Sequence, residues 1–489
     1  MHFLKKYLLL IALLPFNFLL AQNYQAIHGS SYAGSLGPGS NPASIVHVPY
    51  AWDITPVSFQ LKQSTNAFKI NNFSLLSKPD SITISAQNGI KKRFVMANQD
   101  VRLMNVRLNL NAKTAIAFGA NIRNYITASS SKTNGQDTLL TLSDFMKINS
   151  SLVPLAGKLT ANTWAELYTS YAHTIIDDGD RLLNAGLTIK ATRGIAGGYA
   201  VTEAINYVPQ PDINIAGYVL TSGSLQFGYS DNFDKIDSNK TAAANRKLFL
   251  KENRHGVSAD LGMEYIVLTN EDKAGAGDYA YETKIGIAVM DIGRNRYRHG
   301  SRSRVATSVK PGIADTVLEN KFSSVKNFDE FNDSLASIAG AVQVLRGDFF
   351  IYQPTRLLIN IDRHIMNNFF LNAEITIPLV SLVPKKIRSI NELNLLAVTP
   401  RWEIKSLGAY LPVLLNSKKQ LSIGGAFKAG PILMGTHNLA NLFAKNKLQN
   451  GGSYLALTIR PTKIYDRMAH YPKEKLSKKE QRLLNCPTF

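Results

Sequence analysis

The 489-residue chain has one cysteine, Cys486, and no apolar run as long as a membrane-spanning helix requires. A single cysteine excludes a disulfide-stapled scaffold and a cysteine-rich metal cluster. Without about 18 consecutive apolar residues, spanning helices are excluded too, so a membrane form of this chain would have to be a closed β-barrel. The chain also lacks a Pro/Gly/Ser-rich linker. This indicates one large architecture rather than several domains.

Residues 1–21 are organised like a secretory signal peptide. Lys5 and Lys6 form a charged start, Leu8 to Leu14 form a short apolar core, and Ala21 is a small terminal residue. A membrane anchor is the alternative, but the apolar core is shorter than the roughly 20 residues of a spanning helix. We expect cleavage after Ala21 and export to the cell envelope.

Period-two alternation of apolar and polar residues recurs along residues 51–465. The cleanest example is Gly256 to Tyr265, where five apolar residues share one face and Asp260 and Glu264 lie on the other. Several such runs cover eight to eleven residues, close to the roughly 9–11 that a tilted membrane strand needs. We therefore predict an all-β fold, a single transmembrane antiparallel barrel of about 14 strands, even-numbered like bacterial barrels. A soluble β-sandwich also alternates and is the alternative.

Charged residues on the polar faces are predicted to line the barrel lumen, because a charge facing lipid costs about 2–4 kcal/mol near the bilayer midplane. They would form ion pairs that brace the interior, or else line a polar path. This candidate lumen network comprises Asp260, Glu264, Glu374, Arg401, Glu403, Lys405 and Lys428.

Two segments depart from the alternation. Residues 320–345 place apolar side chains at spacings of three and four, which predicts one amphipathic helix in a long loop. We interpret it as a packed cap, with a gate or partner-docking helix as the alternative. Residues 466–489 form a basic segment, predicted to be a solvated periplasmic tail. Either segment offers a surface for an envelope protein partner.

Basic residues exceed acidic ones by 55 to 35, a formal net charge of +20. Five arginines lie within eleven residues that contain no acid: Arg294, Arg296, Arg298, Arg302 and Arg304. If the strand continues past Gly293, the first three would share one face and form an anion-attracting ladder at a pore mouth. On a loop, they would instead contact lipopolysaccharide phosphates or remain solvated. Nucleic acid is a poor partner for an exported protein.

Signals of catalysis are weak. The nine histidines are scattered, and neither a His-Glu-x-x-His motif nor a Gly-x-Ser-x-Gly motif occurs. A triad assembled from distant residues such as His173 or His255 is the alternative. We expect no enzymatic activity, no cofactor and no metal site.

Several motifs, taken in their order along the chain, resemble an uncharacterised outer-membrane β-barrel family of Bacteroidota, domain of unknown function 5723. The matching motifs are Gly39-Ser-Asn41-Pro42-Ala43-Ser44, His255-Gly-Val-Ser-Ala-Asp260, Asp291-Ile-Gly293, Gln353-Pro-Thr-Arg356, Val398-Thr-Pro400-Arg401 and Gly424 to Gly435. That family is distantly similar to fatty-acid-transporter-like and secretion-associated outer-membrane barrels.

The resemblance implies that residues 22–50 form a hatch-like segment in the lumen and that Asn41, Pro42 and Ala43 belong to it. From the residues alone, Asn41 and Pro42 favour a turn or helix start. We expect an outer-membrane protein that contacts lipid and lipopolysaccharide and acts as a passive channel for small apolar or amphipathic molecules. The alternatives are a non-conducting adaptor or scaffold in envelope assembly or secretion, and a soluble secreted β-sandwich binding protein.

Overall fold

The computed structural model describes residues 25–73, 83–137, 141–212, 217–237, 239–251, 254–269, 281–380, 388–443 and 446–463. The predicted signal peptide (1–21) and basic tail (466–489) lie outside these residues. Within the described ranges, no helix has the length and apolar character to cross a membrane.

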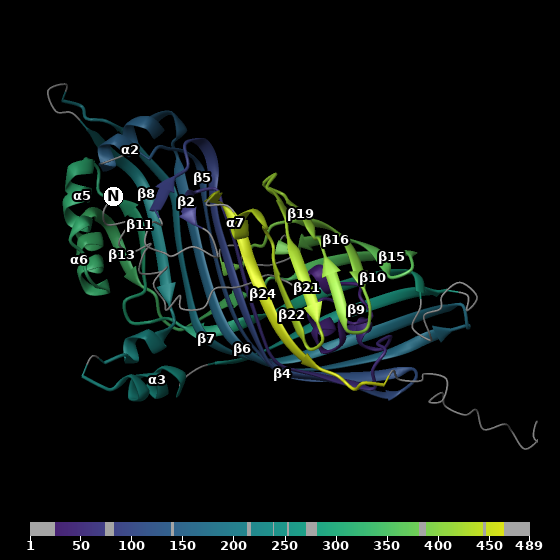
Figure 1. Cartoon of the computed structure of the whole chain (residues 1–489). Coiled ribbons are helices and arrows are strands. Elements are labelled where there is room, and N and C mark those ends of the chain that lie inside the picture. Colours follow the sequence, from purple (N-terminus) through teal and green to yellow (C-terminus); the bar gives the residue numbers. More distant parts are fainter. Residues whose placement is uncertain are drawn as a thin grey trace, which may run out of the picture.

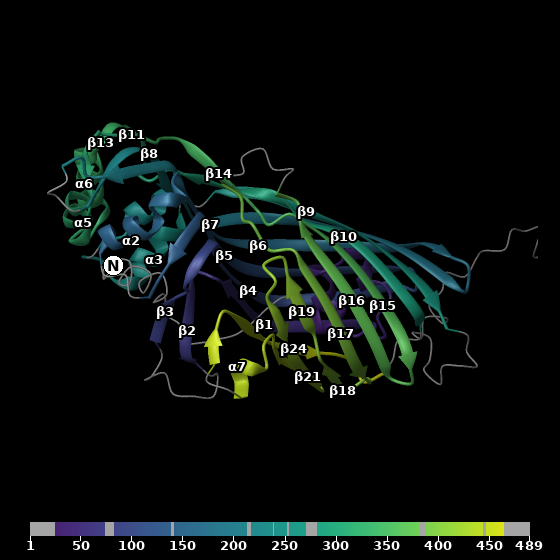
Figure 2. The same ribbon diagram turned by 90° about the horizontal axis from the view of Figure 1, so that it is seen from above.

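The described strands form a closed antiparallel barrel of 14 strand positions (Figures 1 and 2). The ring closes because β1 (Trp52–Thr65) pairs with both β4 (Gly89–Asn111) and β24 (Asn450–Ile459). At five positions, two or three consecutive strands share one place in the ring, and these are joined by "with" below. From β4 onward to β24, the positions in order are β5 (Thr114–Gly135); β6 (Leu155–Asp177); β7 (Arg181–Pro209); β8 (Tyr218–Tyr229) with β9 (His255–Leu268); β10 (Tyr281–Arg298) with β11 (Arg304–Val309) and β12 (Ile313–Ala314); β13 (Ala339–Val344) with β14 (Asp348–Tyr352) and β15 (Arg356–Met366); β16 (Phe369–Pro378); β17 (Leu395–Glu403); β18 (Leu407–Tyr410) with β19 (Val413–Asn416); β20 (Leu421–Ile423) with β21 (Gly425–Ala429); and β22 (Ile432–Thr436).

Both the barrel and its strand count confirm the prediction. The soluble sandwich is excluded, because a sandwich packs two sheets face to face whereas these strands form one ring. The alternation also places the side chains as predicted. On β9, Val257 and Leu261 are 68% and 51% exposed on the outer face, while Asp260 is 1% exposed on the inner face. An apolar outer surface of this kind faces lipid, so the barrel is transmembrane.

The two ends of the barrel differ. Short turns join β4 to β5, β15 to β16 and β17 to β18 at one end, called the turn end here. The opposite end, called the loop end, carries longer connections with the helices α2 (Leu142–Asn149), α5 (Asp315–Ser323), α6 (Phe328–Ile338) and α7 (Ala440–Phe443). A small sheet of β2 (Phe68–Phe73), β3 (Thr83–Ala86) and β23 (Asn446–Leu448) extends the wall there, and α3 (Ala242–Lys251) lies in the interruption between β8 and β9.

The wall rises much higher on one side of the barrel. Strands β4 to β7 are 22 to 29 residues long, whereas β16 has 10. Figures 1 and 2 show this tall side carrying α2, α5 and α6 at its far end.

The helical prediction for residues 320–345 is correct in type but wrong in extent. The chain forms two helices, α5 and α6, and from Ala339 it is a strand that pairs with β11. The break arises because the Asn327 side chain accepts a hydrogen bond from the Glu330 amide and starts a new helix. α6 packs on the barrel wall, where the Phe328 ring stacks 4.8 Å from that of Tyr229.

Candidate functional site

Residues 25–50, called the lumen segment here, lie inside the barrel (Figure 2). Three short 3-10 helices shape the segment: η1 (Gln25–Ile27), η2 (Gly34–Gly39) and η3 (Pro42–Ile45). η1 lies against β17, η2 against β1 and β4, and η3 against β6, β7 and β9. Ala26, Ala43 and Ile45 have no exposed surface, so the lumen segment fills space that the wall encloses.

The predicted hatch residues Asn41, Pro42 and Ala43 form the start of η3. The Asn41 side chain accepts a hydrogen bond from the Ala43 amide, and Pro42 occupies the first helical position. The same Asn41 side chain donates to the Met263 carbonyl oxygen of β9 at 2.9 Å.

Glycines in the wall make room for η3. A Cβ atom at Gly186 of β7 would lie 2.4 Å from backbone atoms of Pro42 and Ala43, and one at Gly262 of β9 would collide with the Asn41 side chain. Only glycine permits so close an approach of two backbones.

Charged side chains of the wall hold the backbone of the lumen segment. Arg107, which has no exposed surface, donates to the carbonyl oxygens of Ile45 at 2.6 Å and Tyr50 at 2.7 Å. Arg102 donates to the Leu36 carbonyl oxygen at 3.0 Å, and the carboxylate of Asp53 accepts from the Ser35 amide. These are charge-assisted bonds, each stronger than a neutral one.

A first buried charge cluster lies against the start of the lumen segment. Arg401 pairs with Asp362 and, at 3.3 Å, with Glu403, which also binds Lys428 at 3.1 Å. Glu403 accepts from the Ser30 hydroxyl at 2.6 Å. Glu374 contacts the His28 ring. The cluster therefore brings together side chains of four wall strands, β15, β16, β17 and β21, beside the segment.

Lys405 is the one predicted network residue that the structure removes from the lumen. β17 ends at Glu403, and Lys405 is exposed in the following turn. The alternation used to place it does not extend past the end of the strand. Glu264 is buried on β9, where the Asn184 side chain donates to it at 3.4 Å.

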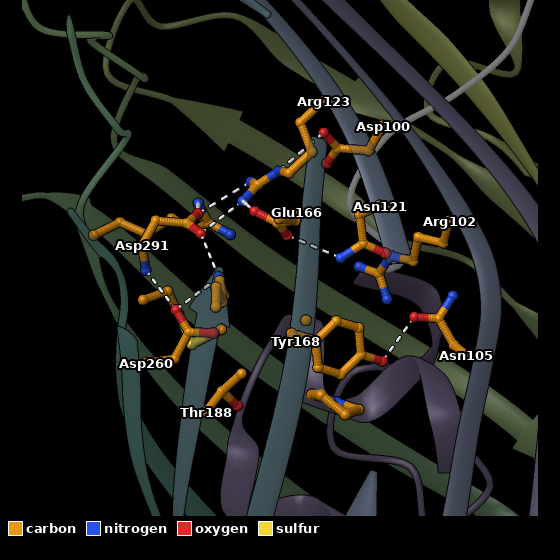
Figure 3. Close-up of a pocket in the computed structure, with 15 residues that line it drawn as sticks. Asp100, Arg102, Asn105, Asn121, Arg123, Glu166, Tyr168, Thr188, Asp260 and Asp291 are labelled. Carbon is orange, nitrogen blue, oxygen red and sulfur yellow. Dashed lines mark hydrogen bonds and ion pairs between the residues drawn. The ribbon is translucent and has the colours of Figure 1, made fainter. Parts of the chain in front are cut away.

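A second buried cluster centres on Asp291 (Figure 3). Its carboxylate binds Arg123 at 2.6 Å, Lys190 at 2.6 Å and Arg356, so three cations from three strands meet one acid. Asp260 adds a second acid, 2.8 Å from the Lys190 ammonium. Of this cluster, only Asp260 belongs to the candidate lumen network, whereas Asp291 and Arg356 belong only to the motifs that resemble the family.

Asp291 lies at a bulge, and this explains why its role was missed. The pairing of β10 with β9 shifts between Val289 and Ile292, and Asp291 has φ 58°. A bulge adds one residue and reverses which face the following side chains occupy. The signal that could have revealed it is the polar Asp291 directly after the inward-facing Met290.

The same bulge turns the arginine ladder outward. Arg294, Arg296 and Arg298 do share one face of β10, but they are exposed and alternate with buried Asn295 and Tyr297. The expectation of a ladder at the pore mouth is therefore wrong. Arg302 and Arg304 lie after the end of β10, and Arg304 is the first residue of β11. Arg302 pairs with Asp329 and Asp234, and Arg304 donates to nearby carbonyl oxygens.

Little free space remains around the second cluster. A cavity between η2 and the wall is lined by Arg102, Glu166, Tyr168 and members of the Asp291 cluster (Figure 3). Its free volume is about 30 Å³, which is room for a few water molecules at most. In this conformation, the cavity has no room for a larger solute.

Three solved structures are similar to this chain, but the likeness is weak. A Pseudomonas aeruginosa FadL homologue has 10% identity and a TM-score of 0.39, with 90% of this chain and 98% of that one covered. The P. putida toluene transporter TodX has 9% identity and a TM-score of 0.34, with 86% and 91% covered. The translocator domain of the autotransporter NalP from Neisseria meningitidis has 9% identity and a TM-score of 0.32, with 90% and 100% covered.

At such scores these likenesses give no information on function. Among curated proteins, none matches this chain. A family model matches residues 42–437 of the sequence, from the start of η3 to one residue past β22, and so includes most of the barrel. The chain belongs to the family of unknown function DUF5723.

Proposed function

We propose that the protein is an outer-membrane channel for small molecules and that the lumen segment keeps it closed. The observation that carries the proposal is the lumen segment itself, held by wall side chains inside a barrel with an apolar outer surface. The segment is joined to the described wall by hydrogen bonds, an ion pair and apolar packing, and none of its residues belongs to a strand of the barrel. It can therefore leave the lumen without breaking the strand pairing of the wall.

The barrel and the predicted signal peptide support an outer-membrane location. Closed barrels with an apolar outer band are the strand-built proteins of bacterial outer membranes. In them, short turns face the periplasm and longer loops face outward. The turn end of this barrel would thus face the periplasm and the loop end the cell exterior.

The wall next to the lumen segment favours amphipathic solutes. The Lys284 ammonium, which donates to the Ser31 hydroxyl of the lumen segment at 2.6 Å, lies 4.1 Å from the centre of the Tyr281 ring. A cation beside an aromatic face suits a molecule with an anionic or polar group on an apolar body. A passive channel needs no catalytic group, and we propose none.

Solute entry into vesicles tests this function. Vesicles with the purified full chain should take up a short amphipathic carboxylate faster than protein-free vesicles, and faster than they take up a neutral sugar of similar size. Equal entry of both solutes would contradict the proposed selectivity. A barrel tight to every solute, with or without the lumen segment, would contradict a channel.

The filled lumen supports a second candidate, a non-conducting scaffold in envelope assembly or secretion. Its docking surfaces would be α5 with α6, where Phe328 is 48% exposed, and the predicted tail at 466–489. Cross-linking in cells separates the two functions. A stable protein partner that is lost when residues 466–489 are removed, together with a sealed barrel, would favour the scaffold.

A further inference from the structure

Three neighbouring strands carry an outward apolar stretch of nearly equal length. The outward positions are apolar from Leu183 to Ala191 on β7, from Val257 to Tyr265 on β9 and from Ile285 to Ile292 on β10. Each stretch covers eight or nine residues, close to the roughly 9–11 that a tilted strand needs to cross the hydrocarbon. These stretches therefore mark the hydrocarbon layer on this side of the barrel.

At the loop end, basic side chains border all three stretches. Arg193 follows on β7, its pairing partner His255 precedes Val257 on β9, and Arg294 follows on β10. Arg296 and Arg298 continue outward from Arg294 on the same exposed face. These basic side chains therefore lie at the level of the lipid headgroups, just outside the hydrocarbon layer.

The helix α3 adds to this basic border. Arg193 donates to the Leu250 carbonyl oxygen of α3 at 2.6 Å, which places the helix beside the strands. Arg246 and Lys247 are exposed on α3, and Leu250 is 38% exposed. A helix with basic and apolar exposed residues suits the plane of a membrane interface. We call Arg193, Arg246, Lys247, Arg294, Arg296 and Arg298 the basic collar.

Little acid balances the collar. In the described part of the chain, its ion pairs are limited to that of Arg296 with Asp348, whose side chains are 50% and 28% exposed. The Arg294 guanidinium lies 4.1 Å from the centre of the Phe350 ring. Stacking on a ring leaves the N–H groups at the guanidinium edge free to donate. Aromatic residues at this height are also typical of the interfacial girdle of membrane barrels.

We infer that the basic collar binds the phosphate groups of anionic lipid in the leaflet at the loop end. Guanidinium groups bind phosphate oxygens bidentately, and a row of them at headgroup height matches the charge of such a leaflet. The inference rests on the membrane location and orientation proposed above. In an outer membrane, the lipid at this leaflet is the phosphorylated glycolipid lipid A.

Lipid binding to the full chain in neutral detergent tests the collar, with lipid A as the probe. The variant Arg294→Gln/Arg296→Gln/Arg298→Gln should bind lipid A roughly tenfold to a hundredfold more weakly, since each interfacial arginine adds about fivefold. Raising the salt should weaken binding to the unaltered chain. A matched control, Arg181→Gln/Arg363→Gln, removes exposed arginines at the turn end and should bind as the unaltered chain does. Gel mobility without heating checks that all variants are folded.

Unchanged lipid A binding by the triple variant would overturn the inference. Equal binding of neutral phosphatidylcholine would overturn it as well, because apolar contact alone would then suffice. Displacement of lipid A by millimolar inorganic phosphate would indicate a small-anion site and not a lipid surface. None of these outcomes depends on solute passage, so failure here is distinguishable from failure of the channel proposal.

Discussion

Deleting Gly29–Ser44 is expected to open the barrel. The deletion removes η2, most of η3 and the contacts of Ser30, Ser31 and Ser35 with the wall. A barrel of 14 strands is wider than the eight-stranded barrels that side chains alone can fill, so an aqueous path should remain. Solute entry into vesicles should rise about tenfold or more over that of the unaltered chain.

A pair of point variants on β7 provides a milder version of the same test. Gly186→Ala places a Cβ 2.4 Å from the backbone of the lumen segment, whereas at Gly198 the nearest atom is 3.7 Å away. Gly186→Ala should therefore raise solute entry, and Gly198→Ala should not. Unchanged entry in both the deletion and Gly186→Ala would show that the lumen segment does not close the path.

Replacing Asp291 with asparagine is expected to destabilise the barrel by about 3–5 kcal/mol, because Arg123, Lys190 and Arg356 lose their shared buried acid. Asparagine is the appropriate replacement, since it accepts the left-handed backbone that φ 58° imposes at this position. The measurement is the urea concentration at the midpoint of unfolding. Unfolding is monitored by the gel mobility of samples that have not been heated.

The control for Asp291 is an exposed ion pair. Glu282 and Arg363 lie 3.4 Å apart, and their side chains are 56% and 63% exposed. Glu282→Gln should change stability by no more than about 1 kcal/mol. If Asp291→Asn were equally mild, the second charge cluster would not brace the wall.

Strand faces could be predicted from the sequence because one side of the wall contacts lipid and the other a filled lumen. Alternation alone placed Asp260, Glu264 and Arg401 on the inner face. It could not identify which charges meet. Asp291 binds side chains from β5, β7 and β15, and strand neighbours around a ring depend on pairing across the whole chain.

Local irregularities caused the errors. The bulge at Asp291 changed the face of Arg294, the end of β17 released Lys405 from the lumen, and Asn327 divided the predicted helix. Each is one residue's departure from a regular period. A periodicity argument extends a pattern through such points, whereas the backbone stops or shifts there.

The most direct test of the central claim measures how often nitroxide labels at two adjacent residues of β9 collide with oxygen and with a water-soluble nickel complex. The labels are placed in a Cys486→Ser background, and the protein is in lipid vesicles. A label at Leu261→Cys should collide with oxygen, which concentrates in the hydrocarbon, and be shielded from a water-soluble nickel complex. A label at Asp260→Cys, on the inner face, should show much lower oxygen accessibility. If the label at Leu261 instead met the nickel complex as freely as one on an exposed loop, the outer face would lie in water and the membrane barrel would be contradicted.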